Sequence, residues 1–186
     1  MRYARVITFL ILAAIFGCKK NPTSSTFVIA ERGYQPSLDI DTSGIIRMVY
    51  GKGDSLLFST SENWGESFSK GILLDTLNGL HLGMSRGPQI SSSANHTVVV
   101  VMNKPGDLYA YSLEHSTNTW RKKIRINDIP QTAKEGLSAI GSDRADNFYV
   151  TWLDLRGDNH NKIYVSHSTN GGDLWQENRL VYRSPD

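Results

Sequence analysis

Two short segments of the chain carry charged side chains that can bind an anionic ligand. Arg86 opens the segment RGP, and Asp154, Arg156 and Asp158 lie in the segment WLDLRGD. A guanidinium group holds a carboxylate through two parallel hydrogen bonds, so gathered arginines suit such a ligand. The two arginines and two aspartates of these segments offer this kind of chemistry. The alternative for Asp154 and Arg156 is a salt-bridged loop at the end of a strand.

The residue pattern argues against several other kinds of chemistry. Asp158, Asn159 and Asn161 lack the acidic ladder and the glycine spacing of a calcium-binding loop. The five histidines are scattered along the chain without the spacing of a transition-metal site. The sequence also lacks a glycine-rich phosphate loop and a serine nucleophile elbow. We expect no cofactor and no bound metal.

A second set of residues recurs at fixed spacing and indicates a structural role. The segments FSTSENWGESF and HSTNGGDLWQ both fit the pattern S-x-N-x-G-x-x-aromatic. Glycine permits the positive φ angle of a tight turn, and serine and asparagine satisfy its backbone groups. The aromatic side chain gives the turn an apolar anchor. The residues of these two predicted turns are Ser61, Asn63, Gly65 and Phe68, and Ser168, Asn170, Gly172 and Trp175.

The segments around these turns repeat at an interval near fifty residues. Leu38, Ile90 and Ile140 lie 52 and 50 residues apart. Each copy has four short runs rich in β-branched and aromatic residues, separated by polar turns, which predicts antiparallel strands. We therefore predict an all-β chain of about three four-stranded β-propeller blades, over residues 34–80, 81–130 and 131–186. The same intervals also separate Tyr50, Met102 and Trp152.

The second copy departs from the pattern at its turn. The segment Ser112 to Trp120 keeps a serine and an aromatic residue but contains no glycine. We expect a fourth strand after it, over Lys122 to Ile126. Four aromatic residues on the strands are expected to pack between blades rather than to form a binding platform. They are Tyr109, Tyr111, Trp152 and Tyr164.

The repeated turn resembles the Asp box, or BNR repeat, of sialidases and sialidase-like six-bladed β-propellers. Asn63 and Asn170 stand where that motif usually has aspartate. The resemblance covers residues 34–182 and implies that the chain supplies half of a six-bladed ring. In that family the boxes lie at the periphery of the blades, away from the ligand. The resemblance therefore implies a structural role for the residues of both turns.

Sialidase activity requires more residues than this resemblance supplies. Family members use three arginines, an aspartate acid/base and a tyrosine nucleophile paired with a glutamate, an exception to the two-carboxylate pattern. Their R-I-P motif and D-x-R segment share one blade. Here Arg86 opens the segment RGP, which resembles R-I-P, in the second copy. The segment WLDLRGD, which holds Asp154, Arg156 and Asp158 and resembles the D-x-R segment, belongs to the third. The resemblance makes these four residues the candidates for a ligand site. We predict that the chain is not catalytic alone, and we assign no catalytic residue.

The N-terminus has the features of an export signal. In residues 1–17, Arg2 and Arg5 precede a short apolar run, as in a secretory signal peptide. The run ends in IFGC, which resembles a bacterial lipobox, so we expect Cys18 to carry lipid and residues 18–33 to form a tether. The alternative is an ordinary signal peptide with an incidental cysteine. The lipobox predicts a lipid-anchored protein of the bacterial cell envelope, at the outer membrane or cell surface.

The charge of the remaining chain argues against binding to nucleic acid. The sequence has 20 Lys and Arg residues against 18 Asp and Glu, and removal of Arg2 and Arg5 leaves 18 basic residues. Because the two signs then balance, we expect neither nucleic acid nor a polybasic membrane contact as a partner.

Three functions fit these observations. The favoured one is a lipid-anchored, sialidase-like module that binds a glycan or a cell-surface protein. The second is an exo-α-sialidase, a glycoside hydrolase, and the third is a truncated chain without function. Three blades leave sheet edges and faces open. We therefore expect either a homodimer that completes a six-bladed ring, or a fragment that is unstable alone.

Overall fold

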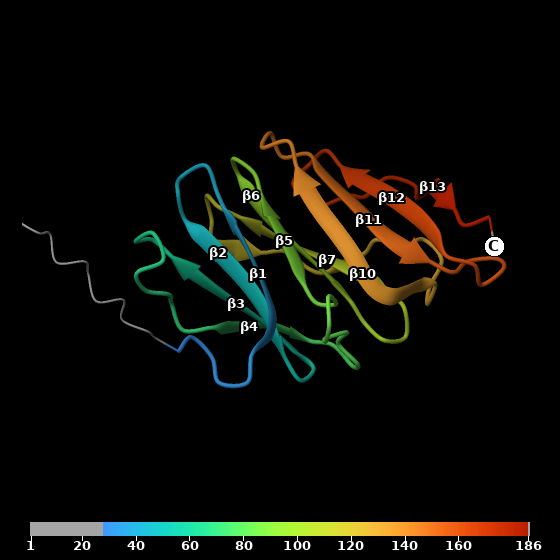
Figure 1. Ribbon diagram of the computed structural model, residues 1–186. Helices are drawn as coiled ribbons and strands as arrows, with labels where there is room; N and C mark the ends of the chain where they lie inside the picture. Colours follow the sequence, from blue (N-terminus) through green and yellow to red (C-terminus); the bar gives the residue numbers. More distant parts are fainter. Residues whose placement is uncertain (1–27, 186) are drawn as a thin grey trace, which may run out of the picture.

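The computed structural model describes residues 28–185, which form three β-sheets arranged side by side (Figure 1). Every regular element between these residues is a strand, and the predicted all-β fold is confirmed. The same part of the chain holds no helix long and apolar enough to cross a membrane. The predicted signal peptide, Cys18 and the first part of the predicted tether lie outside the described residues.

The first and third sheets have the same topology. Each has four antiparallel strands in sequence order, β1-β2-β3-β4 and β10-β11-β12-β13. Their hairpins form where polar turn residues separate two runs rich in β-branched and aromatic side chains. The strands of the first sheet are β1 (Tyr34–Ile40), β2 (Ile46–Lys52), β3 (Ser55–Ser61) and β4 (Ile72–Thr76). Those of the third are β10 (Ala133–Ser142), β11 (Phe148–Asp154), β12 (Lys162–Ser168) and β13 (Arg179–Arg183).

The second sheet differs from the other two at its outer edge. The predicted fourth strand over Lys122 to Ile126 is correct only in part, because two short strands, β8 and β9, both pair with β7. The chain reverses early after β7, through a tight turn in which Asn118 takes a φ of 51°. The strands are β5 (Gln89–Ser92), β6 (His96–Met102), β7 (Leu108–Glu114), β8 (Thr119–Trp120) and β9 (Ile124–Arg125).

Two hydrophobic cores join the three sheets, one on each face of the second sheet. Val99 and Val101 of β6 belong to the core shared with the first sheet, and Val98 and Val100 to the core shared with the third. Because both faces of β6 are buried, its sequence is a continuous apolar run rather than an alternation. The four aromatic residues expected between blades are there: Tyr109 and Tyr111 in the first core, Trp152 and Tyr164 in the second.

One predicted equivalence between the copies is wrong by one residue. Ile40 pairs with Ile46 in the first sheet and Ser142 with Phe148 in the third, which leaves five residues in each turn. The second sheet closes the same turn with four, between Ser92 and Thr97. The residue that corresponds to Tyr50 and Trp152 is therefore Val101, not Met102. By the same shift, Leu113 rather than Ser112 corresponds to the serine of the turn motif.

The strand ends define two sides of the molecule. The Arg86 side holds the starts of β1, β5 and β10 and the hairpins β2–β3, β6–β7 and β11–β12. The Asp-box side holds the turns that follow β1, β5 and β10, together with the two predicted stapled turns. The inner strand β5 contacts both β1 and β10 (Figure 1).

Candidate functional site

The two stapled turns have matching hydrogen bonds. Ser61 Oγ donates to Asn63 Oδ1 (2.9 Å) and accepts the Gly65 N–H (2.9 Å). Asn63 Oδ1 also accepts the backbone N–H of Ser67 (3.0 Å). In this turn, side-chain oxygens accept the backbone N–H groups that would pair with a neighbouring strand in a β-sheet. The corresponding bonds in the second turn join Ser168, Asn170, Gly172 and Leu174.

The second turn packs between two sheets. Trp175 is partly buried against the core between the second and third sheets, and its Nε1 donates to the Gly172 carbonyl (3.1 Å). In the first turn, Phe68 is also partly buried. Both turns lie on the Asp-box side, at the opposite strand ends from Arg86. The hydrogen bonds of both motifs are internal to the turns, and the candidate ligand residues lie on the other side of the molecule.

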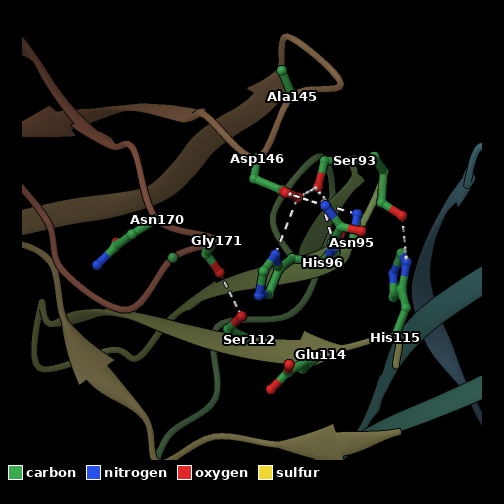
Figure 2. Close-up of polar contacts among 12 residues, drawn as sticks. Ser93, Asn95, His96, Ser112, Glu114, His115, Ala145, Asp146, Asn170 and Gly171 are labelled. Atoms are coloured by element: carbon green, nitrogen blue, oxygen red, sulfur yellow. Dashed lines mark hydrogen bonds and ion pairs between the residues drawn. The ribbon is translucent and has the colours of Figure 1, made fainter. Parts of the chain in front are cut away.

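A polar cluster on the Asp-box side joins the second and third sheets (Figure 2). Asp146, from the turn after β10, accepts hydrogen bonds from Ser93 Oγ, from the Asn95 backbone N–H (3.1 Å) and from Asn95 Nδ2 (2.6 Å). It also contacts His96 Nδ1 at 3.1 Å. Burial alone would raise the pKa of Asp146, but these hydrogen bonds lower it well below its usual range. The carboxylate is fully engaged between sheets, and the sequence predicted only a polar turn there.

Arg86 lies on the other side, where the inner strands begin. Its Nε donates to the Glu135 carbonyl, and its Nη2 lies 3.3 Å from Glu135 Oε2. The guanidinium side chain is 26% exposed. Met84 and Glu135, which contact Arg86, take φ angles of 52° and 65°. Gln35, which donates to the Met84 carbonyl, takes a φ angle of 51°. Such left-handed backbone is unfavourable for these residue types, and it clusters at functional sites.

His81 adds a titratable group beside Arg86. Burial lowers the pKa of His81, and the positive charges of Arg86 and Lys104 lower it further, against a smaller opposite effect of Glu135. The ring lies so close to Gly136 that a Cβ there would be 2.5 Å from His81 Nδ1. A neutral imidazole at this point can donate or accept a hydrogen bond without adding charge.

Asp154 and Arg156 form a separate, buried network. The Asp154 side chain is 0% exposed and accepts Arg156 Nε (2.9 Å), Arg156 Nη2 (2.7 Å) and Trp152 Nε1 (3.0 Å). Burial would raise the pKa of Asp154, but the hydrogen bonds of Arg156 and Trp152 lower it. Arg156 also reaches Asp128 (2.6 Å) and lies over the Tyr164 ring at 3.9 Å. Its guanidinium is therefore occupied by the protein itself.

Asp158 belongs to a third group, in the hairpin between β11 and β12. Its carboxylate is paired with Lys162 and Arg183. Hydrogen bonds from Lys162 and from the His160 backbone, with the nearby charges, lower the pKa of Asp158 to about 2. The exposed position of Arg183, at 60%, makes this a surface ion pair.

The four candidate residues thus lie in three separate networks on the Arg86 side. Of these four, only Asp154 and Arg156 are in contact. Glu135 and His81 lie beside Arg86 instead, and neither was predicted from the sequence. Glu135 directly precedes Gly136, the residue that takes the place of Arg86 in the third copy, and this repeat position could have pointed to it. Within residues 28–185 no three His, Cys, Asp or Glu side chains gather as metal ligands would.

Comparison with known proteins supports the fold class. No protein-family model and no curated protein sequence matches this chain. Among solved structures, it is similar to the α-L-arabinanase of Penicillium chrysogenum, with a TM-score of 0.58 and 13% identity over 88% of this chain. It is also similar to a mutant of the NanB sialidase of Streptococcus pneumoniae, with a TM-score of 0.53 and 14% identity over 77% of this chain. A Hadza microbial sialidase matches with a TM-score of 0.53 and 15% identity over 82%.

These similarities show a β-propeller fold of the kind found in those enzymes, as predicted. The chain spans 53% of the length of the arabinanase, 22% of the NanB chain and 38% of the Hadza sialidase. At such low identity the similarity concerns the fold and carries no residue roles.

Proposed function

We propose that the chain is a lipid-anchored, propeller-type module that binds an anionic glycan at Arg86. The main observation in its favour is the arrangement around this side chain. Arg86 is partly exposed where the inner strands begin, and three neighbouring residues hold left-handed backbone conformations. Its carboxylate partner, Glu135, is 49% exposed, so a ligand carboxylate can take its place on the guanidinium.

Two other functions are less well supported. An exo-α-sialidase, or another glycoside hydrolase like the structural neighbours, would need a nucleophile and an acid beside the bound sugar. In the described part of the chain, the carboxylate in contact with Arg86 is Glu135, and Arg156 is committed to Asp154 and Asp128. A truncated chain without function is the third reading, and it predicts no binding.

Binding of sialyllactose to three variants tests the proposal. We expect Arg86→Ala to weaken binding about tenfold or more, because hydrogen bonds to a charged group contribute about 1.5–3 kcal/mol. Glu135→Gln should strengthen binding, since it removes the carboxylate that competes for Arg86. Arg183→Ala removes an exposed arginine of another network and serves as the control. Titration calorimetry measures all three.

Three results would contradict this proposal. Equal affinity of Arg86→Ala and the unchanged protein would remove Arg86 from the ligand site. Hydrolysis of a fluorogenic α-sialoside above the buffer rate, lost in Arg86→Ala while the fold is retained, would favour the enzyme instead. Absence of binding by the unchanged protein would favour the truncated chain.

The membrane anchor is a separate part of the proposal. The only cysteine of the sequence, Cys18, follows Gly17 at the end of the apolar run of residues 6–16. We expect Cys18→Ser to move the protein from the membrane fraction to the soluble fraction, because acyl chains bound to the protein provide the anchoring. Metabolic labelling with a fatty acid measures the modification. A substituted protein that still carries label, or that stays in membranes after its signal is cleaved, would argue against lipidation.

A further inference from the structure

Within residues 28–185, each of the two outer sheets has one face on which no other sheet packs. We call the face of the first sheet that points away from the second the β1 end face, and the corresponding face of the third sheet the β12 end face. On the β1 end face, Leu38 is 58% and Leu73 59% exposed. The residues that correspond to Leu38 in the other two copies, Ile90 and Ile140, pack in the two cores. The first sheet therefore has a third apolar contact surface, and no other sheet formed by residues 28–185 packs on it.

The β12 end face is also apolar. A hollow on this face is lined by side chains from β10, β11 and β12. Along these strands the lining residues alternate with residues whose side chains point to the other face, toward the core shared with the second sheet. The lining residues are Leu137, Ala139, Thr151, Leu153 and Ile163. On the β1 end face, the segment from Val28 to Gly33 lies against Met48 and Tyr50. It leaves Leu38, Ile40 and Leu73 exposed.

The contact between the third and second sheets shows how such faces meet. The Gly171–Gly172 backbone of the third sheet lies against the second: Gly171 is close to His96, and a Cβ on Gly172 would be 2.7 Å from Val98 Cγ2. Ser112 Oγ donates to the Gly171 carbonyl (Figure 2). The stapled turn of one sheet thus presses on the preceding sheet.

In the described part of the chain, no other sheet packs against the stapled turn of the first sheet, and this turn carries a tryptophan. Trp64 corresponds to Gly171, is 80% exposed and takes a φ of 58°. A left-handed conformation is rare and unfavourable for a bulky residue. The edge of its ring lies near Gly44, but most of the ring is exposed, so Trp64 contributes little to the stability of a single chain. Tryptophan is, however, among the residues that contribute most to protein interfaces.

The β12 end face has an aromatic surface next to the position that corresponds to the Gly171 contact. Its two residues correspond to Val98, the neighbour of Gly172, and to Ser112, the partner of the Gly171 carbonyl. By the pairing of the strands, Tyr149 corresponds to Val98, and His167 corresponds to Ser112. The Tyr149 and His167 rings are stacked, with centroids 5.8 Å apart and an angle of 16° between planes. Tyr149 is 49% exposed. At the Gly171 contact, the second sheet has room only for glycine. A flat aromatic pair on the β12 end face can instead pack against the large side chain of Trp64.

We propose that a second copy of this chain closes the ring, with Trp64 of each copy packed on Tyr149 and His167 of the other. A two-fold axis through the centre of the ring makes both contacts identical, as closed symmetry requires. Two copies also supply the extent of a complete ring, since one chain covers 53% of the arabinanase. Closure buries both end faces, which an open array of sheets leaves exposed.

Sedimentation velocity of the full chain in detergent micelles, over a range of protein concentrations, tests this proposal. We expect a species of two chains. Trp64→Gly should raise its dissociation constant about 30-fold or more, which corresponds to about 2 kcal/mol. Because glycine accepts the left-handed φ, this variant should fold at least as stably as the unchanged monomer. Leu174→Ala is the control, since Leu174 is exposed in the corresponding turn of the third sheet, which already has a neighbour.

Tyr149→Ala provides the matching change on the other face. It should weaken the dimer, and its effect should not add to that of Trp64→Gly, because both variants remove one contact. Additive effects, or a dissociation constant unchanged in Trp64→Gly, would overturn the proposed contact. A chain that stays monomeric at every concentration would overturn the dimer, and would favour further sheets of a longer polypeptide as the occupant.

Discussion

Replacement of Arg156 by alanine is expected to lower the free energy of unfolding by about 3–5 kcal/mol, the usual cost of leaving a buried charge without its partner. The Asp154 side chain is completely buried and receives two hydrogen bonds from the Arg156 guanidinium. Alanine removes both of these bonds and the contact with the Tyr164 ring. Denaturant unfolding followed by circular dichroism measures the loss.

Two further variants make the result specific to the buried pair. Arg156→Lys keeps the charge but not the two-pronged geometry, so it should recover only part of the stability. Arg183→Ala removes an arginine that is 60% exposed, and it should leave stability nearly unchanged. If Arg156→Ala unfolds at the same denaturant concentration as the unchanged protein, Arg156 has no structural role and is again a candidate for ligand binding.

Replacement of Gly106 by alanine is expected to cost about 3 kcal/mol or more, because strained backbone and steric overlap act together. Gly106 lies in the hairpin between β6 and β7 with a φ of 108°. A Cβ at this position would be 2.9 Å from the Gln131 carbonyl carbon and 3.0 Å from the Ala133 oxygen. These are backbone atoms of the segment that leads into the third sheet, and they cannot rotate away as a side chain can.

Gly53→Ala is the matched control for this prediction. Gly53 lies in the corresponding hairpin of the first sheet with a φ of 59°, and a Cβ there would have no neighbour within 4 Å. It should therefore show the backbone cost alone, about 1 kcal/mol. If the melting temperature falls equally in both variants, the β6–β7 hairpin is not in tight contact with Gln131 and Ala133, and the prediction is wrong.

The features predicted correctly from the sequence are those determined by local residue patterns. Runs of β-branched residues between polar turns predicted the strands, and the continuous apolar run in β6 corresponds to burial on both faces. The turn motif also predicted its local shape, because Ser61 and Asn63 form their hydrogen bonds within a few residues of themselves. The repeat of about fifty residues predicted three similar sheets.

The incorrect predictions concern small differences between the copies. The turn after β5 has one residue fewer than the corresponding turns of the other two sheets. Because side chains alternate along a strand, an alignment by a constant sequence interval assigns each residue of β6 to the wrong face of the sheet. The sequence interval therefore predicted Met102 as the equivalent of Tyr50 and Trp152, whereas the pairing of the strands shows that the equivalent is Val101. In the same way, loss of the turn motif after β7 divided the outer strand in two.

The surroundings of the candidate residues were decided by the tertiary structure. Arg86 and Glu135 are 49 residues apart, and Asp146 is 51 residues from Asn95, yet each pair is in contact. The sequence determined that these charged and polar residues stand at strand ends, because the local pattern of strands and turns is encoded in neighbouring residues. Which of them meet depends on how one sheet is placed against the next. That placement follows from side-chain packing in two cores assembled from distant segments.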